Sequence, residues 1–278
     1  MRFYEESLGL SDSAFGILRS LIHERTGLFY ENSKRDVLAN KLSPLVIERG
    51  FEAFLDYYYL LKYDPEAGEE WQRVIDALSV QETYFWREMD QVRALVEVVA
   101  PEFFSMYPDT PLRIWSAACA TGEEPLTIAM ALNEAGWFDR APIQIYASDA
   151  SPSAIERARR GVYRERSFRS LPPELRARYF TETQGGWQVS PALHARVQWS
   201  VANLVEEADV AHLATAPVIF CRNVFIYFSE DAIRKTVNLF SQRMPTPGYL
   251  FVGAAESLLK VTADFELQEV GGAFVYVK

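Results

Sequence analysis

Cysteine is scarce in this 278-residue chain, which has only Cys119 and Cys221. Two cysteines cannot build the disulfide framework of a small secreted domain, so a reducing compartment, the cytoplasm, is expected. The three histidines are scattered and have no ligand spacing with the cysteines, which predicts no metal site. Long apolar runs are also missing, and no charged-then-apolar segment opens the chain. We therefore expect neither membrane insertion nor a secretory signal.

Positive charge is in deficit, and the net charge of −10 predicts no general affinity for nucleic acid or anionic lipid. The charge is unevenly spread. Residues 150–200 contain nine arginines, no lysine and four glutamates. This stretch is either a solvated helix and loop or a docking face for an acidic protein, and the sequence leaves both interpretations open.

Hydrophobic periodicity divides the chain into two parts. Residues 1–85 have apolar side chains at helical spacing, which predicts a domain of about four helices. Residues 86–278 form the second domain, with a linker at 86–110, and from Pro111 onward strand and helix patterns alternate. The alternation predicts an α/β fold, a mostly parallel sheet covered by helices. It stops at 161–195, where a small antiparallel β-subdomain is expected as an insertion.

Polar residues follow several predicted strands of this sheet, where ligands of doubly wound folds bind. The turn at 116–125 is rich in small residues, but it has neither the glycine spacing of a dinucleotide site nor the Lys-Ser/Thr of a phosphate loop. Glu123 opens the next helix, Asp149 ends the second strand and Asn203 follows the third. Together with segment 221–228, these residues suit a nucleoside that carries no phosphate.

Four segments, 79–88, 115–125, 220–228 and 253–258, resemble the CheR family of chemotaxis methyltransferases, which esterify receptor glutamates. The resemblance covers nearly the whole chain. It implies a Rossmann-like class I methyltransferase sheet with an amino-terminal helical domain. It also implies S-adenosylmethionine as cofactor, S-adenosylhomocysteine as product, and a helical chemoreceptor-like protein as partner.

The family pattern implies a role for each matching residue. Arg87 and Tyr227 would face the reacting methyl group and the acceptor carboxylate. The cofactor would be bound by Gln81, Thr83, Arg87, Ala118, Gly122, Glu123, Asp149, Asn203, Leu204, Arg222 and Asn223.

Two departures from the family pattern leave the acceptor open. The fourth segment has alanine at 254–255 in place of two residues with polar side chains. The second helix carries a run of arginines in receptor-directed relatives, whereas this chain has Lys41, Pro44 and Ile47 at three of the basic positions. A methyltransferase with another acceptor, and a non-catalytic cofactor-binding sensor or scaffold, therefore remain as alternatives.

Overall fold

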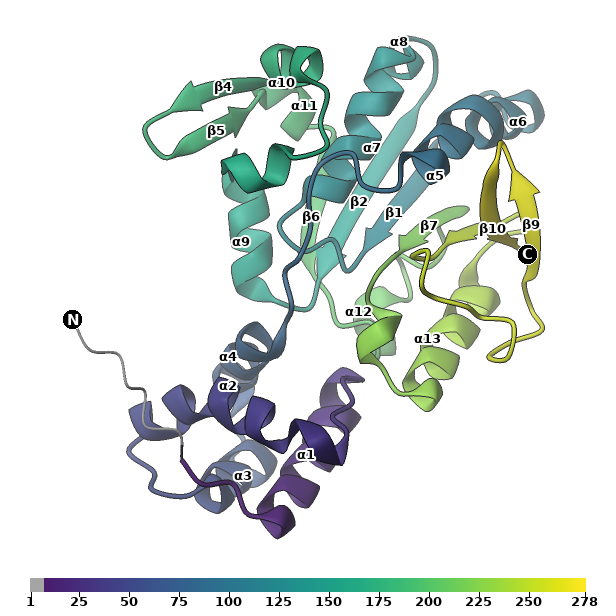
Figure 1. Ribbon diagram of the computed structural model, residues 1–278. Coiled ribbons are helices and arrows are strands. Elements are labelled where there is room, and N and C mark those ends of the chain that lie inside the picture. The colour runs from purple at the N-terminus through teal and green to yellow at the C-terminus, as the bar shows by residue number, and fades with distance from the viewer. Residues whose placement is uncertain (1–7) are drawn as a thin grey trace. The chain divides into compact units, whose positions relative to one another are not determined.

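The computed structural model describes residues 8–278, and the chain divides into two compact units (Figure 1). Unit 1 extends to Val80 and includes Tyr227–Ser229, and unit 2 comprises Gln81–Ile226 and Glu230–Lys278. The boundary therefore lies five residues before the expected one at residue 85. Within the described residues, no helix is long and apolar enough to cross a membrane.

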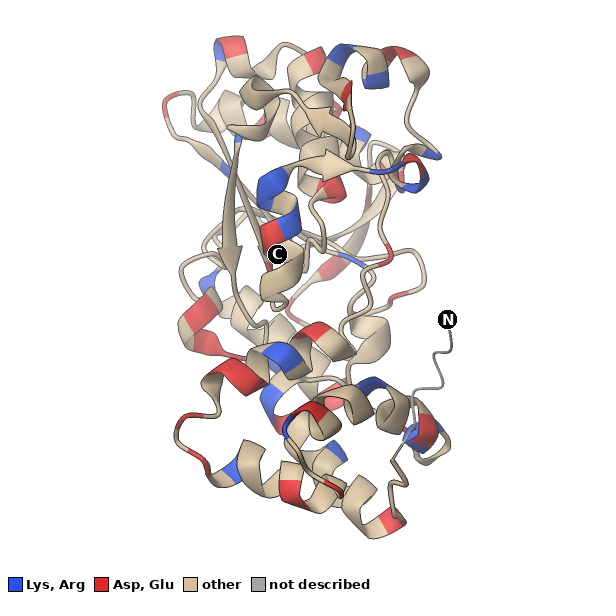
Figure 2. Ribbon diagram, turned by 90° about the vertical axis from the view of Figure 1, so that its left-hand side faces the viewer, with Lys and Arg blue, Asp and Glu red and all other residues tan. Residues whose placement is uncertain are grey.

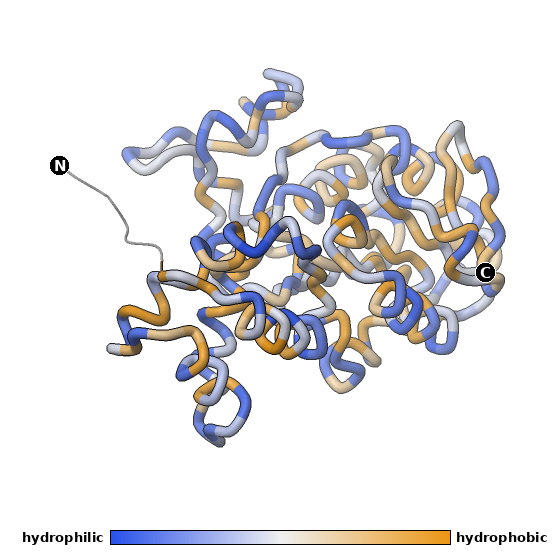
Figure 3. The backbone as a smooth tube through the Cα atoms, turned by 60° about the horizontal axis from the view of Figure 1, so that its bottom comes forward, coloured by the Kyte–Doolittle hydropathy of each residue, from blue (hydrophilic) through white to orange (hydrophobic). Residues whose placement is uncertain are grey.

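Unit 1 has the four predicted helices. Ser11 caps the first of them through its side chain, and Gly27 ends it in the left-handed conformation with a φ of 76°. Apolar and polar segments alternate along these helices, as expected of amphipathic helices around one core (Figure 3). The helical elements are α1 (Asp12–Thr26), η1 (Asn32–Lys34), α2 (Arg35–Glu48), α3 (Phe54–Tyr63) and α4 (Gly68–Leu78).

A buried carboxylate crosslinks the helices of unit 1. The side chain of Glu70 is 1% exposed, and its Oε2 accepts hydrogen bonds from Arg49 Nε at 2.7 Å and Arg73 Nη1 at 3.2 Å. Tyr57 donates its hydroxyl to Oε1 at 2.7 Å. Burial alone would raise the pKa of Glu70, but these hydrogen bonds and charges outweigh burial and hold the pKa below its ordinary value.

Unit 2 is built on a seven-stranded sheet of order β6-β2-β1-β7-β8-β10-β9 (Figure 1). The first five strands in this order are parallel to one another, and β10 is antiparallel to β8 and β9. This topology confirms the predicted Rossmann-like sheet. The strands are β1 (Leu112–Ala117), β2 (Ile143–Asp149), β6 (Val197–Val201), β7 (Val218–Cys221), β8 (Tyr249–Phe251), β9 (Glu266–Val270) and β10 (Ala273–Val277).

Helices cover both faces of the sheet (Figure 1). Leu112 and Ile114 of β1 point into the core shared with α5 and α7. Trp115 points to the opposite face of the sheet, where it contacts Phe240 of α13. Acidic and basic positions are interspersed over the helices (Figure 2). The helices of this unit outside the insertion are α5 (Met89–Ala94), the π-helical η2 (Leu95–Val99), α6 (Ala100–Met106), α7 (Glu123–Glu134), α8 (Trp137–Arg140), α9 (Pro152–Arg160), α12 (Glu207–Val210) and α13 (Glu230–Arg243). The short helix η4 (Phe225–Tyr227) begins in unit 2, and its last residue belongs to unit 1.

The expectation of a linker at 86–110 needs correction, because most of this segment is helical. The helices α5, η2 and α6 follow one another and contact β10 and β1. Val92, Leu95 and Val99 are almost fully buried in the main core. The segment is therefore a structural layer of unit 2.

The insertion contains the expected antiparallel sheet, of order β3-β5-β4, together with helices that were not expected. Pro172-Pro173 is a breaker signal in sequence, but Pro173 occupies the first turn of a helix, where its missing N–H is tolerated. The elements are β3 (Val162–Tyr163), η3 (Glu165–Phe168), α10 (Pro173–Tyr179), β4 (Phe180–Thr183), β5 (Gly186–Val189) and α11 (Pro191–His194).

Candidate active site

The turn between β1 and α7 brings the backbone into conformations that few residues adopt. Ala118 has a φ of 59°, Ala120 of 48° and Gly122 of 94°. A Cβ on Gly122 would lie 2.8 Å from Cη2 of Trp199, closer than van der Waals contact allows. The turn therefore requires glycine at this position, and small side chains keep its backbone accessible.

Asp149, at the end of β2, fixes the shape of this turn. Its Oδ2 accepts a hydrogen bond from the backbone N–H of Ala120, and its Oδ1 accepts one from Ser151, both at 2.9 Å. The Ser151 side chain caps α9 and accepts a hydrogen bond from Gln81 Nε2 at 3.0 Å. Two predicted site residues, Gln81 and Asp149, thus meet at the start of α9.

The third predicted strand end is also ordered by local hydrogen bonds. Asn203 is 9% exposed, and its Oδ1 accepts the N–H of Val205 at 3.3 Å. Its own backbone N–H donates to Asp209 Oδ2 at 3.1 Å. Leu204 beside it is buried. The arrangement fixes the backbone at the carboxyl end of β6, the edge to which β1 and β2 also contribute.

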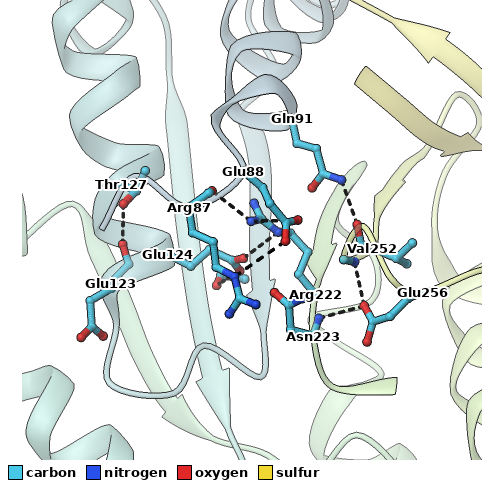
Figure 4. A network of polar contacts seen from close by, with 12 residues as sticks. Arg87, Glu88, Gln91, Glu123, Glu124, Thr127, Arg222, Asn223, Val252 and Glu256 are labelled. Atoms are coloured by element: carbon cyan, nitrogen blue, oxygen red, sulfur yellow. Dashed lines mark hydrogen bonds and ion pairs between the residues drawn. The ribbon is translucent and has the colours of Figure 1, made fainter. Parts of the chain in front are cut away.

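The two glutamates at the start of α7 point in different directions (Figure 4). Glu123 accepts hydrogen bonds from the hydroxyls of Thr121 at 2.6 Å and Ser167 at 2.9 Å. Glu124 accepts one from Ser116 at 2.6 Å and lies 3.4 Å from Arg222 Nε. Burial raises the pKa of both carboxyls. Glu124 thus lies beside Arg222, and cofactor binding by Glu123 stays a prediction.

Arg222 links the carboxyl end of β7 to the segment around Arg87 (Figure 4). Its side chain is 2% exposed, lies 3.3 Å from Glu88 Oε2, and donates from Nη2 to the backbone oxygen of Arg87 at 3.0 Å. Two carboxylates, Glu88 and Glu124, therefore compensate one buried guanidinium. The side chain of Arg87 itself is 27% exposed, and its guanidinium lies over the ring of Tyr84.

Glu256 is a site residue that the sequence analysis missed. Its Oε2 accepts hydrogen bonds from the backbone N–H groups of Asn223 at 2.8 Å and Gly253 at 2.7 Å, and its Oε1 accepts one from Ile226 at 3.3 Å (Figure 4). One carboxylate thereby joins the turns that follow β7 and β8. The fourth motif contains this glutamate, but spacing alone could not show that it binds the backbone of the third.

Backbone strain is concentrated in this region. In residues 8–278, positive φ at a residue other than glycine occurs only at Trp86, Glu88, Ala118, Ala120 and Asn223. Two of these residues flank Arg87, two form the β1–α7 turn and one follows β7. Such conformations cost about 1–3 kcal/mol each and gather where function requires them.

The remaining predicted residues are placed as follows. Thr83 is half-buried in unit 2. Tyr227 belongs to unit 1, where its backbone oxygen accepts the N–H of Phe29 at 2.9 Å, next to a bridge between Leu28 and Phe228. Arg87 belongs to unit 2, so the expected pairing of Arg87 with Tyr227 stays a prediction.

The sheet order and the polar residues at the carboxyl ends of its parallel strands define an S-adenosylmethionine-dependent methyltransferase. Residues 81–272 match the family described as CheR methyltransferase, SAM binding domain, and residues 13–79 match CheR methyltransferase, all-alpha domain. The chain belongs to the CheR methyltransferase family, as its motifs predicted.

Full-length relatives agree with this assignment. The chain is 34% identical to chemotaxis protein methyltransferase 2 of Vibrio cholerae over 272 residues, which cover 97% of this chain and 94% of that protein. It is 34% identical to the chemotaxis protein methyltransferase of Klebsiella aerogenes, with 95% and 89% covered. Against that of Escherichia coli K12 it is 32% identical, with 95% and 91% covered.

The site residues fit the cofactor that the family implies. The strained β1–α7 turn exposes backbone without a phosphate-binding lysine, and the carboxylate of Asp149 lies at the end of β2. The buried Nη1 of Arg222 has no hydrogen-bond partner among residues 8–278. Together, these groups suit a zwitterionic nucleoside without phosphates better than a nucleotide.

Proposed function

We propose that this chain esterifies glutamate side chains of a helical chemoreceptor in the cytoplasm, with Arg87 and Tyr227 at the reacting groups. The observation that carries the proposal is the full-length similarity to chemotaxis protein methyltransferases, which extends over both units. When bound, S-adenosylmethionine supplies a methyl group on a cationic sulfur that leaves readily. An acceptor carboxylate is already ionised near neutral pH, so no general base is needed.

The task of the protein is then to position the acceptor and exclude water. In the proposed arrangement, the guanidinium of Arg87 orients the incoming carboxylate through charge-assisted hydrogen bonds. Its partly exposed side chain is available for such contacts, whereas Arg222 is buried between Glu88 and Glu124. Asp149 and Asn203 would hold the nucleoside, and the backbone at Ala118 would approach its methionine part.

The second helix of unit 1 favours an acceptor that differs from the ordinary one. Lys41 donates its ammonium to the backbone oxygens of Leu78 at 2.9 Å and Ala77 at 3.3 Å, and burial lowers its pKa. It therefore caps α4 and is not available as a docking charge. Val37 and Ile47 are exposed on the same helix. An acceptor helix that binds this surface would present apolar as well as acidic side chains to it.

The test supplies radiolabelled S-adenosylmethionine to the full chain together with cytoplasmic fragments of receptors encoded in the same genome. We expect base-labile methyl esters on one receptor, and a loss of about 10- to 100-fold in rate for Arg87→Gln, the value of one charge-assisted contact. Formation of S-adenosylhomocysteine without base-labile label would indicate a different acceptor. Tight cofactor binding without turnover on any acceptor would contradict an enzymatic role.

A further inference from the structure

A cavity of about 600 Å³ lies beside the inserted subdomain, within unit 2. Ten residues line it, of which four are arginines: Arg157, Arg160, Arg164 and Arg166. Thr121 and Glu123 of the β1–α7 turn also line it. A volume of this size is typical of small-molecule sites, which hold roughly 300–1,000 Å³.

The arginines of this cavity are poorly compensated. Arg157 donates to the uncharged groups Gln81 Oε1 and Ser153 O, and Arg160 lies 3.9 Å from its only carboxylate, Glu156. The other two, Arg164 and Arg166, are exposed and form no hydrogen bond or ion pair within the part of the chain that the structure describes. Positive charge is therefore in excess around the opening.

The one carboxylate in the cavity offsets this excess only in part. Glu123 interacts electrostatically with Arg166, but it is a single negative charge among four arginines. Like charges that converge with too few partners cost free energy, so a site of this kind is suited to an anion that supplies several negative charges at once. Guanidinium groups match phosphate oxygens in a bidentate geometry.

The arrangement favours a compact ligand over an acidic protein segment. Arg157 and Arg160 lie on one face of α9, and Arg164 and Arg166 belong to the segment that follows β3. Two elements therefore direct arginines at one cavity. We propose that this cavity binds a linear polyphosphate chain, either free or as part of a nucleoside triphosphate. The cavity adjoins the cofactor site, since Glu123 lines the cavity and is also expected to contact the cofactor, but the four arginines are not among the predicted cofactor residues. The proposal does not depend on the identity of the methyl acceptor.

Isothermal titration calorimetry on the full chain tests this proposal, with sodium tripolyphosphate and ATP as the probes. Saturating S-adenosylhomocysteine keeps adenosine out of the cofactor site, and about 0.15 M salt screens non-specific attraction. The double variant Arg164→Gln, Arg166→Gln removes two guanidinium groups at exposed positions. The matched control, Arg93→Gln with Arg140→Gln, removes the same charge from exposed positions elsewhere in unit 2.

We expect one binding site for both probes, with affinity about 100-fold weaker in the double variant, since each charged contact is worth about tenfold. The control should bind as the unaltered chain does. Equal affinity for the two probes would identify the phosphate chain as the group that is bound. Tighter binding of ATP would show that the nucleoside also contributes to the affinity.

Four results would overturn the proposal. The first three are the absence of binding, an equal loss in the control variant, and displacement of tripolyphosphate by S-adenosylhomocysteine. A glutamate-rich peptide that binds through Arg164 and Arg166 more tightly than tripolyphosphate would overturn it in favour of an acidic protein partner. Should the double variant unfold, the single variant Arg164→Gln should still lose about tenfold in affinity.

Discussion

Replacement of Glu256 by alanine should damage cofactor binding more than it damages the fold. The carboxylate accepts two backbone hydrogen bonds shorter than 3 Å, from Asn223 and Gly253, and a longer one from Ile226. Hydrogen bonds to a charged group contribute about 1.5–3 kcal/mol each. Glu256 is only half-buried, so water can replace part of this contribution. We expect a loss of roughly 2–3 kcal/mol in total.

The loss should fall mainly on the turn after β7. Asn223 has a φ of 59°, a strained conformation that the bond to Glu256 helps to maintain. Without this bond the turn should relax, and the arginine and asparagine of the third motif should leave their positions. The dissociation constant for S-adenosylhomocysteine should then rise about 10- to 100-fold, because each 1.4 kcal/mol corresponds to tenfold.

Calorimetry and thermal unfolding, carried out on the same samples, separate the two effects. Glu269→Ala is the matched control, since Glu269 is exposed on β9 and has no side-chain hydrogen bond among residues 8–278. Glu256→Gln should be milder than Glu256→Ala, because the amide oxygen can still accept the two shorter bonds. A dissociation constant for Glu256→Ala equal to that of the control would refute the reasoning, even if the melting temperature fell.

Three further predictions concern stability. Gly122→Ala should lower the free energy of unfolding by about 2–3 kcal/mol in chemical denaturation, because the added Cβ would collide with Trp199. The control Gly136→Ala, which also has a positive φ but open space around it, should lower the free energy of unfolding by about 1 kcal/mol. Equal losses would contradict the steric explanation. The folded-state pKa of Glu70 is lowered, so its contribution is present above the unfolded pKa of about 4.3 and is lost as the pH falls through the folded value. Urea denaturation between about pH 5 and pH 2 should therefore show a loss of stability that is smaller in Glu70→Gln than in the unaltered chain, and an unchanged pH profile would exclude this role. Arg222→Gln removes the buried guanidinium that pairs with the partly buried carboxylates of Glu88 and Glu124, and it should cost about 2–3 kcal/mol in the same assay. An exposed Arg93→Gln should cost less than about 0.5 kcal/mol.

Periodicity was sufficient to predict most of the fold. The alternation expected from Pro111 onward is present, for example in the strand Val197–Val201 and the helix Glu230–Arg243, because the apolar spacing of these segments agrees with their tertiary contacts. The helices of the inserted subdomain were missed, since Pro173 is equally consistent with a loop and with a first helical turn. The segment from Met89 to Met106 was expected to be a linker, although it packs on the sheet.

The sequence predicts the site residues that belong to a motif. It does not predict the contacts between site residues that are far apart in the chain. Motifs identified Asp149 and Asn223, but the partners of these residues depend on turns that bring other segments together. Glu123 and Glu124 are adjacent in sequence, and only the helix orientation shows which of them meets Arg222. The carboxylate of Glu256 binds backbone N–H groups, which carry no sequence signal at all.

The short return of the chain to unit 1 has a consequence for biosynthesis. Leu28 forms its bridge with Phe228, and the backbone N–H of Phe29 donates to Tyr227, so part of the first unit is encoded far downstream of the rest of it. At about 5–20 residues per second, a ribosome needs on the order of ten to forty seconds to proceed from the first partner of this bridge to the second. The backbone at Leu28 and Phe29 therefore stays without these partners while most of unit 2 is synthesised, and a fragment that ends at Val80 would lack the segment that pairs with it.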